Sequence, residues 1–298
     1  KATCDRWRSV WVDQTRLSKE RFGGFADKSI GKLYGLNRMK PAIVCGSGPS
    51  LKTSIDTLRD NAKSEHPVMV ISCLHNFGYF EDEGFHADYY LTLDSGEITV
   101  ADVFEGRKEP PEFYWEKTKG KKLLATVSTH PKLFDLWQGE IVLFNTMIPD
   151  LEIQTKIQEV EKFTHYISSG GNALGGCFYA AKVYFCSDPI IFVGADFCFD
   201  TNNQFHSYKT HYDTPGGYQM WPSVFSEINR KTWPSYLNFK FFLDHVACKV
   251  PGNYISASEG LLGAYPEGNI KQFKYMCLKD ALLPYTSMDM VKLQSIDA

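Results

Sequence analysis

The sequence has no Cys-x-x-Cys pair, and its eight cysteines are scattered along the chain, most of them within apolar runs. This pattern favours buried, reduced thiols over a disulfide framework or a zinc site. No stretch approaches the roughly 18 consecutive apolar residues of a membrane helix, and residues 1–5 lack the character of a signal peptide. We therefore expect a protein of the cytoplasm without a membrane span.

The sequence also has no large excess of charge of either sign. The 298 residues carry a formal net charge of -3, which provides no basic field for binding phosphates over a broad surface. One local basic patch would still allow a nucleic-acid partner. The hydrophobic share of 43% and the aromatic share of 14% can fill a substantial core, so we expect one large domain or two modest ones.

The stretch at residues 41–51 organises the rest of the chain. Residues 42–45 form a short continuous apolar run, which is typical of a strand buried on both faces of a parallel sheet. A tight turn rich in glycine follows: Gly46, Ser47, Gly48, Pro49 and Ser50. Apolar residues then recur at helical spacing: Leu51, Ile55, Leu58 and Ala62. Free N–H groups of the turn and the positive end of the helix dipole would favour an anion there.

Further apolar runs have the length and composition of buried strands: residues 68–73, 87–94, 121–127, 141–144, 189–196 and 254–255. Helical patterns between them predict an α/β protein with a doubly wound parallel sheet. We expect an N-terminal helical extension over 1–40 and a nucleotide-binding domain over 41–200. A lid or substrate loop over 201–235 would precede a C-terminal helix, last strand and tail over 236–298. No strong pattern follows Leu278, where Pro284 falls.

Polar residues stand at the ends of the predicted strands and in a second glycine-rich turn: Asn76, Asp94, Ser168, Ser169, Gly170, Gly171, Asn172 and Asp196. In a doubly wound sheet these ends meet at one edge, where such sheets bind ligands. Any one of these residues is equally well explained as a cap or turn residue. Together they favour a nucleotide or another phosphorylated ligand. The first turn lacks the third glycine of a dinucleotide fingerprint and the Gly-Lys-Ser/Thr of a P-loop.

Residues 197–234 turn polar and aromatic without clear periodicity, which is common in lids and substrate loops. Two histidines five residues apart alternate there with tyrosines: His206, Tyr208, His211 and Tyr212. A neutral histidine can take a proton from an attacking hydroxyl near pH 7, and a tyrosine hydroxyl can hydrogen-bond a departing phosphate. These four are our candidate catalytic residues, with polar groups on a surface loop as the alternative explanation.

Asp94 and Glu97 together could hold Mg²⁺, which would matter for phosphoryl chemistry. A solvated strand end is the alternative explanation for the pair. We therefore expect no required cofactor, with Mg²⁺ as the one candidate.

The motifs as a set resemble a known family. They are residues 41–51, 90–94 (Tyr-Leu-Thr-Leu-Asp), 168–173 (Ser-Ser-Gly-Gly-Asn-Ala), 190–197 (Ile-Ile-Phe-Val-Gly-Ala-Asp-Phe) and 255–260 (Ile-Ser-Ala-Ser-Glu-Gly). The set is similar to the family that groups motility-associated-factor glycosyltransferases with archaeal hydroxymethyl-dihydropterin pyrophosphokinases. The Gly-x-Gly-Pro-Ser-Leu opening also resembles that of bacterial sialyltransferases.

The resemblance implies a Rossmann-like domain that binds a nucleotide-activated donor, often a CMP-linked nonulosonic acid, at the turns beginning with Gly46 and Ser168. Asp196 would anchor the strand before the lid. The resemblance also implies which residues surround the nucleotide: Asn76, Ser169, Gly170, Ser256, Ser258 and Glu259.

The implied activity is that of a glycosyltransferase, sialyltransferase-like, which passes a sugar from the nucleotide donor to an acceptor hydroxyl by direct displacement. A CMP-sugar is the favoured donor. Two alternatives stay open: an ATP-using, Mg²⁺-dependent pyrophosphokinase with Asp94 and Glu97 as its carboxylates, and a nucleotide-binding module without catalysis. The acceptor, whether a glycan, a protein or a modified nucleobase, and the formation of a homo-oligomer also stay open.

Overall fold

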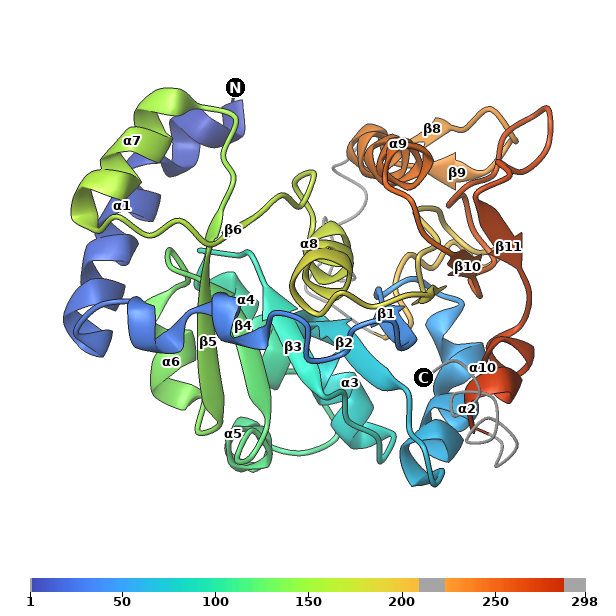
Figure 1. The fold of residues 1–298 in the computed structure, drawn as a ribbon, viewed down its shortest axis with the longest axis horizontal. Coiled ribbons are helices and arrows are strands. Elements are labelled where there is room, and N and C mark those ends of the chain that lie inside the picture. Colours follow the sequence, from blue (N-terminus) through green and yellow to red (C-terminus); the bar gives the residue numbers. More distant parts are fainter. Residues whose placement is uncertain (1, 209–222, 287–298) are drawn as a thin grey trace, which may run out of the picture.

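A sheet of nine parallel strands forms the centre of the molecule (Figure 1). The structure, a computed structural model, describes residues 2–208 and 223–286, with side chains from residue 7 onward. The strand order is β11-β10-β7-β1-β2-β3-β4-β5-β6. The strands are β1 (Ala42–Cys45), β2 (Met69–Cys73), β3 (Tyr89–Thr92), β4 (Lys122–Thr126), β5 (Glu140–Thr146), β6 (Tyr166–Ile167), β7 (Ile190–Val193), β10 (Tyr254–Ser256) and β11 (Phe273–Tyr275). The α/β class and the doubly wound parallel sheet are therefore confirmed.

The sheet has a topological switch point at β1. On one side β1 pairs with β2, and the chain continues strand by strand to β6. The chain then returns to place β7 on the other side of β1, and β10 and β11 extend that side. Doubly wound sheets bind ligands outside the carboxyl ends of the strands at such a point. Here that position lies between the ends of β1 and β7.

Both faces of β1 are buried, which explains its continuous apolar sequence. Ile43 and Cys45 point into one hydrophobic core, and Ala42 and Val44 point into the other. The same division runs across the sheet, so the molecule has three layers with the strands in the middle.

The first core is covered by most of the helices: α1 (Ala2–Phe22), α2 (Leu51–Lys63), α3 (Phe77–Asp82), α4 (Ile98–Phe104), α5 (Pro111–Lys117), α6 (Pro131–Leu136), α7 (Leu151–Val160) and α10 (Leu278–Thr286). The second core is covered by a short 3₁₀ helix (Ile30–Leu33), by α8 (Ala173–Tyr179) with the π-helical turn Ala180–Tyr184, and by α9 (Pro234–Lys249). α1 and α7 lie side by side at one edge of the molecule (Figure 1).

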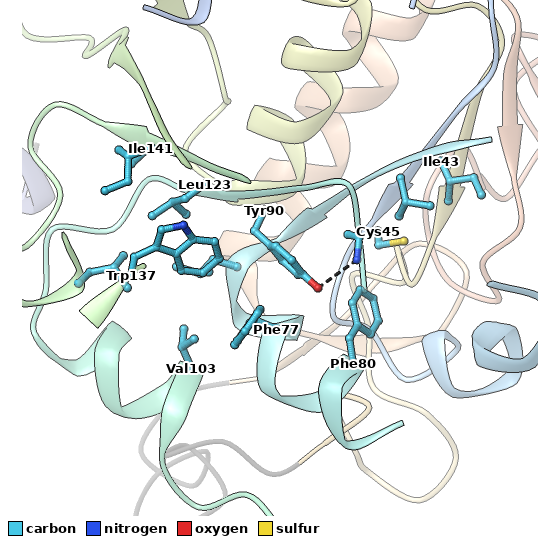
Figure 2. Close-up of a cluster of buried hydrophobic side chains, with 14 of the residues drawn as sticks. Ile43, Cys45, Phe77, Phe80, Tyr90, Val103, Leu123, Trp137 and Ile141 are labelled. Atoms are coloured by element: carbon cyan, nitrogen blue, oxygen red, sulfur yellow. Dashed lines mark hydrogen bonds between the residues drawn. The ribbon is translucent and has the colours of Figure 1, made fainter. Parts of the chain in front are cut away.

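Aromatic side chains dominate the first core where α3 and α4 meet β3 (Figure 2). The ring of Phe77 meets that of Tyr90 edge to face, with 5.1 Å between the centroids. The buried Tyr90 hydroxyl accepts a hydrogen bond of 3.0 Å from the N–H of Ala87. A buried phenol needs such a partner, because an unbonded polar group in a core costs free energy.

The predicted strands are all present, and the predicted helices after the first turn and around residues 237–246 are α2 and α9. The prediction that Ala62 belongs to the buried apolar face of α2 is wrong. Ala62 is exposed, and the buried position next to it is held by Asn61. The Asn61 side chain bonds both the N–H and the carbonyl of Val68 at 2.9 Å, so this amide is buried with its hydrogen bonds made.

No helix was predicted after residue 277, and the structure corrects this. Leu278–Thr286 form α10, which contains Pro284 and packs Leu278, Ala281 and Leu282 into the first core against α2. Tertiary packing here outweighs the low helix propensity of proline.

A small antiparallel hairpin of β8 (Val224–Phe225) and β9 (Lys231–Thr232) lies within the segment expected to be a lid. None of the helices in the described ranges, 2–208 and 223–286, is long and apolar enough to cross a membrane.

Candidate functional site

A cavity of about 270 Å³ opens at the switch point. One set of lining residues follows the strands: Gly46, Ser47, Gly48, Cys73, His75, Asp94, Gly194, Ala195, Asp196 and Phe197. A second set comes from the helices and the segment before the undescribed residues: Ile98, Thr99, Asp102, Gly171, Asn172, Ala173, Leu174, Phe205, His206, Tyr208, Tyr236 and Phe239. The glycine turn after β1, the acids after β3 and β7, and the turn before α8 therefore meet at one cavity, as the strand ends predicted.

The glycine turn after β1 crosses the turn after β7 at close range. The N–H of Gly46 donates to the carbonyl of Val193 at 2.8 Å, and the N–H of Gly48 donates to the carbonyl of Gly194 at 2.9 Å. A Cβ atom at Gly46 or Gly48 would lie 2.5 or 2.7 Å from the Gly194 oxygen. The glycines are needed here because two backbones touch.

The Asp196 carboxylate is buried and faces the beginning of α2. Its Oδ2 accepts a hydrogen bond of 2.7 Å from the N–H of Ser50, and its Oδ1 accepts one of 2.6 Å from the Ser50 hydroxyl. The N–H of Glu259 donates to Oδ1 at 3.2 Å. Burial raises the pKa of Asp196 above its ordinary value, although the hydrogen bonds from Ser50 and Glu259 oppose that rise.

This arrangement corrects the expectation that free N–H groups of the turn face a bound anion. The N–H groups of Gly46, Gly48, Ser50 and Leu51 are all bonded within the chain, the last of them to the Gly48 carbonyl at 3.0 Å. The anion at the N-terminus of α2 is the Asp196 carboxylate itself. The turn lines the cavity, but these four N–H groups already donate to partners within the chain.

Asn76 ties the turn to the end of β2. Its amide nitrogen donates to the Gly46 carbonyl and to the Ser72 hydroxyl, each at 2.9 Å. Its amide oxygen accepts a hydrogen bond of 3.0 Å from the Tyr208 hydroxyl. The side chain is fully buried and is absent from the cavity wall described above. Asn76 therefore holds the glycine turn and Tyr208 in place without lining the cavity itself.

The segment at residues 205–208 closes one side of the cavity against the glycine turn. The N–H of Ser207 donates to the Ser47 carbonyl at 3.1 Å, and the Ser207 hydroxyl donates to the Gly48 carbonyl. Of the four predicted catalytic residues, His206 and Tyr208 line the cavity, with their rings stacked at 6.0 Å between centroids. His211 and Tyr212 lie outside the described residues.

Tyr208 is held by groups on two sides. The Arg107 guanidinium lies 4.5 Å from the centre of its ring, and the ring of Tyr79 packs at 5.2 Å. Burial raises the pKa of the Tyr208 hydroxyl above its ordinary value, against the opposing effects of Arg107 and Ser47. This hydroxyl is a hydrogen-bond donor to Asn76, in a position that fixes the segment to the sheet.

Among the cavity residues that were not predicted from the sequence are His75 and Asp102. His75 directly precedes Asn76 at the end of β2, and Asp102 lies on α4. The His75 Nε2 atom is 3.7 Å from an Asp102 carboxylate oxygen. Burial lowers the pKa of His75, but its interaction with the Asp102 carboxylate and the negative charge of Asp94 outweigh this effect and raise the pKa overall. The position of His75 at a strand end was the available signal.

The second glycine turn forms the start of α8. The Asn172 side chain accepts a hydrogen bond of 2.8 Å from the N–H of Gly175 and so caps the helix, and the Ser169 hydroxyl accepts one of 3.1 Å from the N–H of Gly171. Gly171 and Asn172 line the cavity, whereas Ser168, Ser169 and Gly170 lie outside its wall.

The predicted residues after β10 also support the site from outside the cavity wall. The Ser258 hydroxyl accepts a hydrogen bond of 2.8 Å from the N–H of Ala195, while Glu259 bonds Asp196 through its backbone. Ser256 is the buried last residue of β10.

The structure separates the predicted Mg²⁺ pair. Asp94 lines the cavity, but Glu97 forms an exposed salt bridge of 3.0 Å with Lys132. Among the residues of the described ranges, no three His, Cys, Asp or Glu side chains form a group that could hold a metal. A cation here would need substrate oxygens among its ligands, as Mg²⁺ commonly does.

The chain matches a family model described as 6-hydroxymethylpterin diphosphokinase MptE-like, over residues 22–202 and so over more than half of its length. Among solved structures it is similar to a MAf glycosyltransferase from Magnetospirillum magneticum AMB-1, with a TM-score of 0.58 and 13% sequence identity. The similarity covers 96% of this chain but only 41% of that chain, and at this identity it shows a shared fold. No curated protein matches the chain.

Proposed function

Because the chain belongs to the 6-hydroxymethylpterin diphosphokinase MptE-like family, we propose that it is a transferase whose donor is a group activated by a nucleotide. More specifically, we propose a glycosyltransferase that passes a sugar from a CMP-sugar to an acceptor hydroxyl. One solved structure with a similar fold is that of a glycosyltransferase, which makes a sugar donor the first one to test.

The observation that carries the proposal is the cavity at the switch point. It is bounded by turns from both halves of the sheet, by the start of α8 and by the segment at residues 205–208. Its volume of about 270 Å³ is near the lower end of small-molecule sites and fits part of a nucleotide sugar. Position, size and mixed lining all favour a small organic ligand.

The cavity lining combines two kinds of side chain. Some are aromatic: Phe197, Phe205, Tyr236 and Phe239. Others are polar: His75, Asp94, Thr99 and Asp102. Aromatic rings stack on a flat base, and carboxylates accept hydrogen bonds from sugar hydroxyls. We therefore propose that the aromatic residues pack against the base of the donor and that the polar residues bind its sugar.

In the proposed reaction the acceptor oxygen attacks the anomeric carbon while the bond from that carbon to the phosphate oxygen breaks. The protein must position the two partners, take the proton of the acceptor hydroxyl and stabilise the leaving phosphate. We assign the base to His206, which lies on the cavity wall. Tyr208 positions this segment through Asn76.

A second candidate function is a Mg²⁺-dependent diphosphokinase that uses ATP. The observation in its favour is that Asp94 and Asp102 line the cavity, while no Lys or Arg does so among the residues that the structure describes. Phosphates near two carboxylates would need a cation beside them. Asp94 is the carboxylate that this reaction would use.

A thermal-shift panel of CMP, CDP, UDP, GDP and ATP, each with and without Mg²⁺, separates the candidates. A nucleotide at 100 times its dissociation constant adds about 2.7 kcal/mol to the stability of the folded state. Stabilisation by CMP without metal, together with turnover of a CMP-sugar in the presence of a chelator, supports the glycosyltransferase.

Stabilisation only by ATP with Mg²⁺ would support the diphosphokinase instead. Binding of a nucleotide without transfer or hydrolysis of any donor would indicate that the protein is a nucleotide-binding module without catalysis. If no nucleotide in the panel shifts the melting temperature, the proposed nucleotide site is wrong.

A further inference from the structure

His75 and Asp102 form a pair among the polar residues that line the cavity. Both residues line the cavity, and the His75 side chain is 29% exposed whereas that of Asp102 is 6% exposed. Their closest atoms, Nε2 of His75 and Oδ2 of Asp102, are 3.7 Å apart. With Nε2 directed to Asp102, the other ring nitrogen, Nδ1, is the one that can exchange a proton with a ligand.

The backbone around this pair is fixed by Arg107. Its Nη2 atom donates to the carbonyl oxygen of Asp102 at 2.7 Å and to that of His75 at 3.4 Å. The same guanidinium lies against the ring of Tyr208. One cation thus joins the end of α4, the end of β2 and the segment at residues 205–208. This arrangement fixes the backbone that carries the imidazole.

The charges around the imidazole favour its protonated form. The acids that face it are Asp102 from α4 and Asp94 from the end of β3, with the thiol of Cys73 from β2 nearby. Arg107 is the cation on this side, and its guanidinium is bonded to carbonyl oxygens. Burial opposes protonation, but the acids outweigh it and raise the pKa of His75.

From this geometry we infer that His75, oriented by Asp102, is the general acid that gives a proton to the phosphate oxygen leaving from the donor. The inference rests on the proposed glycosyltransferase function. His75 is the second catalytic residue, and Asp102 is its positioning residue.

The step balances with the groups already assigned. The acceptor oxygen forms a bond to the anomeric carbon and loses its proton to neutral His206. The bond between that carbon and the phosphate oxygen breaks, and its electron pair stays on the oxygen, which takes the proton from the His75 imidazolium. Solvent returns the proton to His75 and removes the one on His206. One histidine must be protonated and the other neutral, so kcat/KM should have a bell-shaped pH profile.

The first experiment measures pH profiles of CMP-N-acetylneuraminate turnover for the wild type and for His75→Gln, His206→Gln and Asp102→Asn. His75→Gln should lower kcat by about 10²–10⁴-fold and abolish the alkaline limb, because the variant has no acid to lose. His206→Gln should abolish the acid limb instead. Asp102→Asn should keep both limbs, with the alkaline limb moved to lower pH. The exposed His66 provides a control, since His66→Gln should leave the whole profile unchanged.

An alkaline limb and a full kcat that survive in His75→Gln would overturn the inference while leaving the transferase intact. A second measurement needs neither turnover nor a substitution at His75. The pKa of His75 is followed by NMR of the histidine ring protons, with and without CMP. Bound CMP should raise this pKa, because the phosphate would lie beside the imidazolium, and Asp102→Asn should lower it.

The outcomes of the two experiments separate the two claims. If CMP binds and the pKa of His75 does not change, the assignment of His75 is wrong even where transfer occurs. If CMP raises the pKa but no donor is consumed, the placement of His75 beside the phosphate is supported and the glycosyltransferase is wrong. If CMP does not bind, both fail.

Discussion

The Asp196 carboxylate accepts hydrogen bonds from both the backbone N–H and the hydroxyl of Ser50, at 2.7 and 2.6 Å. The two residues follow β7 and β1, the strands on either side of the switch point. In P-loop and dinucleotide-binding folds, the helix after the glycine-rich turn offers its N-terminus to a ligand phosphate. In this protein an internal carboxylate occupies that place and joins the two halves of the sheet.

Asp196→Asn should destabilise the fold by about 1.5–3 kcal/mol, the size of a hydrogen bond to a charged group. Asparagine keeps one acceptor oxygen but places an NH₂ group against one of the donors from Ser50 or Glu259. Ser50→Ala removes one of the donors to this carboxylate and should also cost about 1.5–3 kcal/mol. Urea unfolding curves of the three proteins measure both values.

Asp60→Asn, an exposed aspartate on α2, is the matched control and should change the unfolding free energy by less than about 0.5 kcal/mol. If Asp196→Asn is as stable as this control, the carboxylate does not hold the two halves together. A bound anion would then be the better explanation of the turn.

Gly48→Ala should destabilise the protein because its Cβ would meet backbone and carboxylate atoms. The added atom would lie 2.5 Å from Oδ2 of Asp196 and 2.7 Å from the carbonyl oxygen of Gly194. Forcing one carbon into a packed site costs about 1–3 kcal/mol. The measurement is the unfolding free energy, together with the dissociation constant of CMP, which should rise as the turn moves.

Gly84→Asn tests whether any glycine substitution has this effect. Gly84 has a φ of +67° and nothing within 4 Å of a Cβ, and asparagine tolerates that conformation. The control should lose little stability. Equal losses at both glycines would show that the crossing of the two turns is not the cause.

The sheet could be predicted from the sequence because most strands are continuous apolar runs, of which residues 42–45 and 190–193 are the clearest. β11 and the hairpin of β8 and β9 have two or three residues each, too few for any periodicity. Helix α10 was missed because Pro284 argued against it, and only its packing on α2 explains why it forms. The misses are elements whose stability comes from tertiary contacts.

The edge of the sheet where these residues meet could be predicted from the sequence, but the contacts between them could not. Strand ends placed the glycine turn, Asp94 and Asp196 at one edge of the sheet. That Asp196 bonds Ser50, 146 residues away, follows only from the crossing of the two turns. The pairing of His75 with Asp102 likewise depends on how α4 packs beside the end of β2.

Tyr208→Phe should loosen the segment at residues 205–208 while preserving the contact between the ring and Arg107. The lost hydroxyl leaves the amide oxygen of Asn76 buried without this donor, which costs about 1–3 kcal/mol. Tyr208→Leu removes the aromatic contact as well and should cost more, by about 0.5–2 kcal/mol. Stability and the dissociation constant of CMP should worsen in the same order.

Tyr34→Phe is the control for loss of a phenol hydroxyl. Tyr34 is 61% exposed and its ring also lies near a guanidinium, that of Arg38 at 5.6 Å. This variant should match the wild type in both measurements. A Tyr208→Phe variant with unchanged stability and CMP affinity would mean that the bond to Asn76 does not hold the segment.

The stability of the protein should depend on pH through Asp188, which lies two residues before the start of β7. Its carboxylate accepts hydrogen bonds from the backbone and the side chain of Asn253, each at 2.9 Å, and from Lys182 at 3.1 Å. Burial raises the pKa of Asp188, but these bonds outweigh it and lower the pKa below 3.8 overall. The folded state therefore binds a proton less readily than the unfolded state.

Since the pKa of Asp188 is lower in the folded state, its contribution to stability is complete well above pH 3.8 and is lost as the pH falls through the folded value. Asp188→Asn should therefore cost about 1.5–3 kcal/mol at neutral pH, and the difference from the wild type should shrink in acid. Glu152→Gln serves as a contrast, because it should lose little stability. Lys156 and Arg8 lower the pKa of Glu152 to about 2, but the Glu152 side chain is 59% exposed, so solvent screens both ion pairs. Urea unfolding at a series of pH values checks both, and a constant deficit of Asp188→Asn at every pH would show that its charge plays no part.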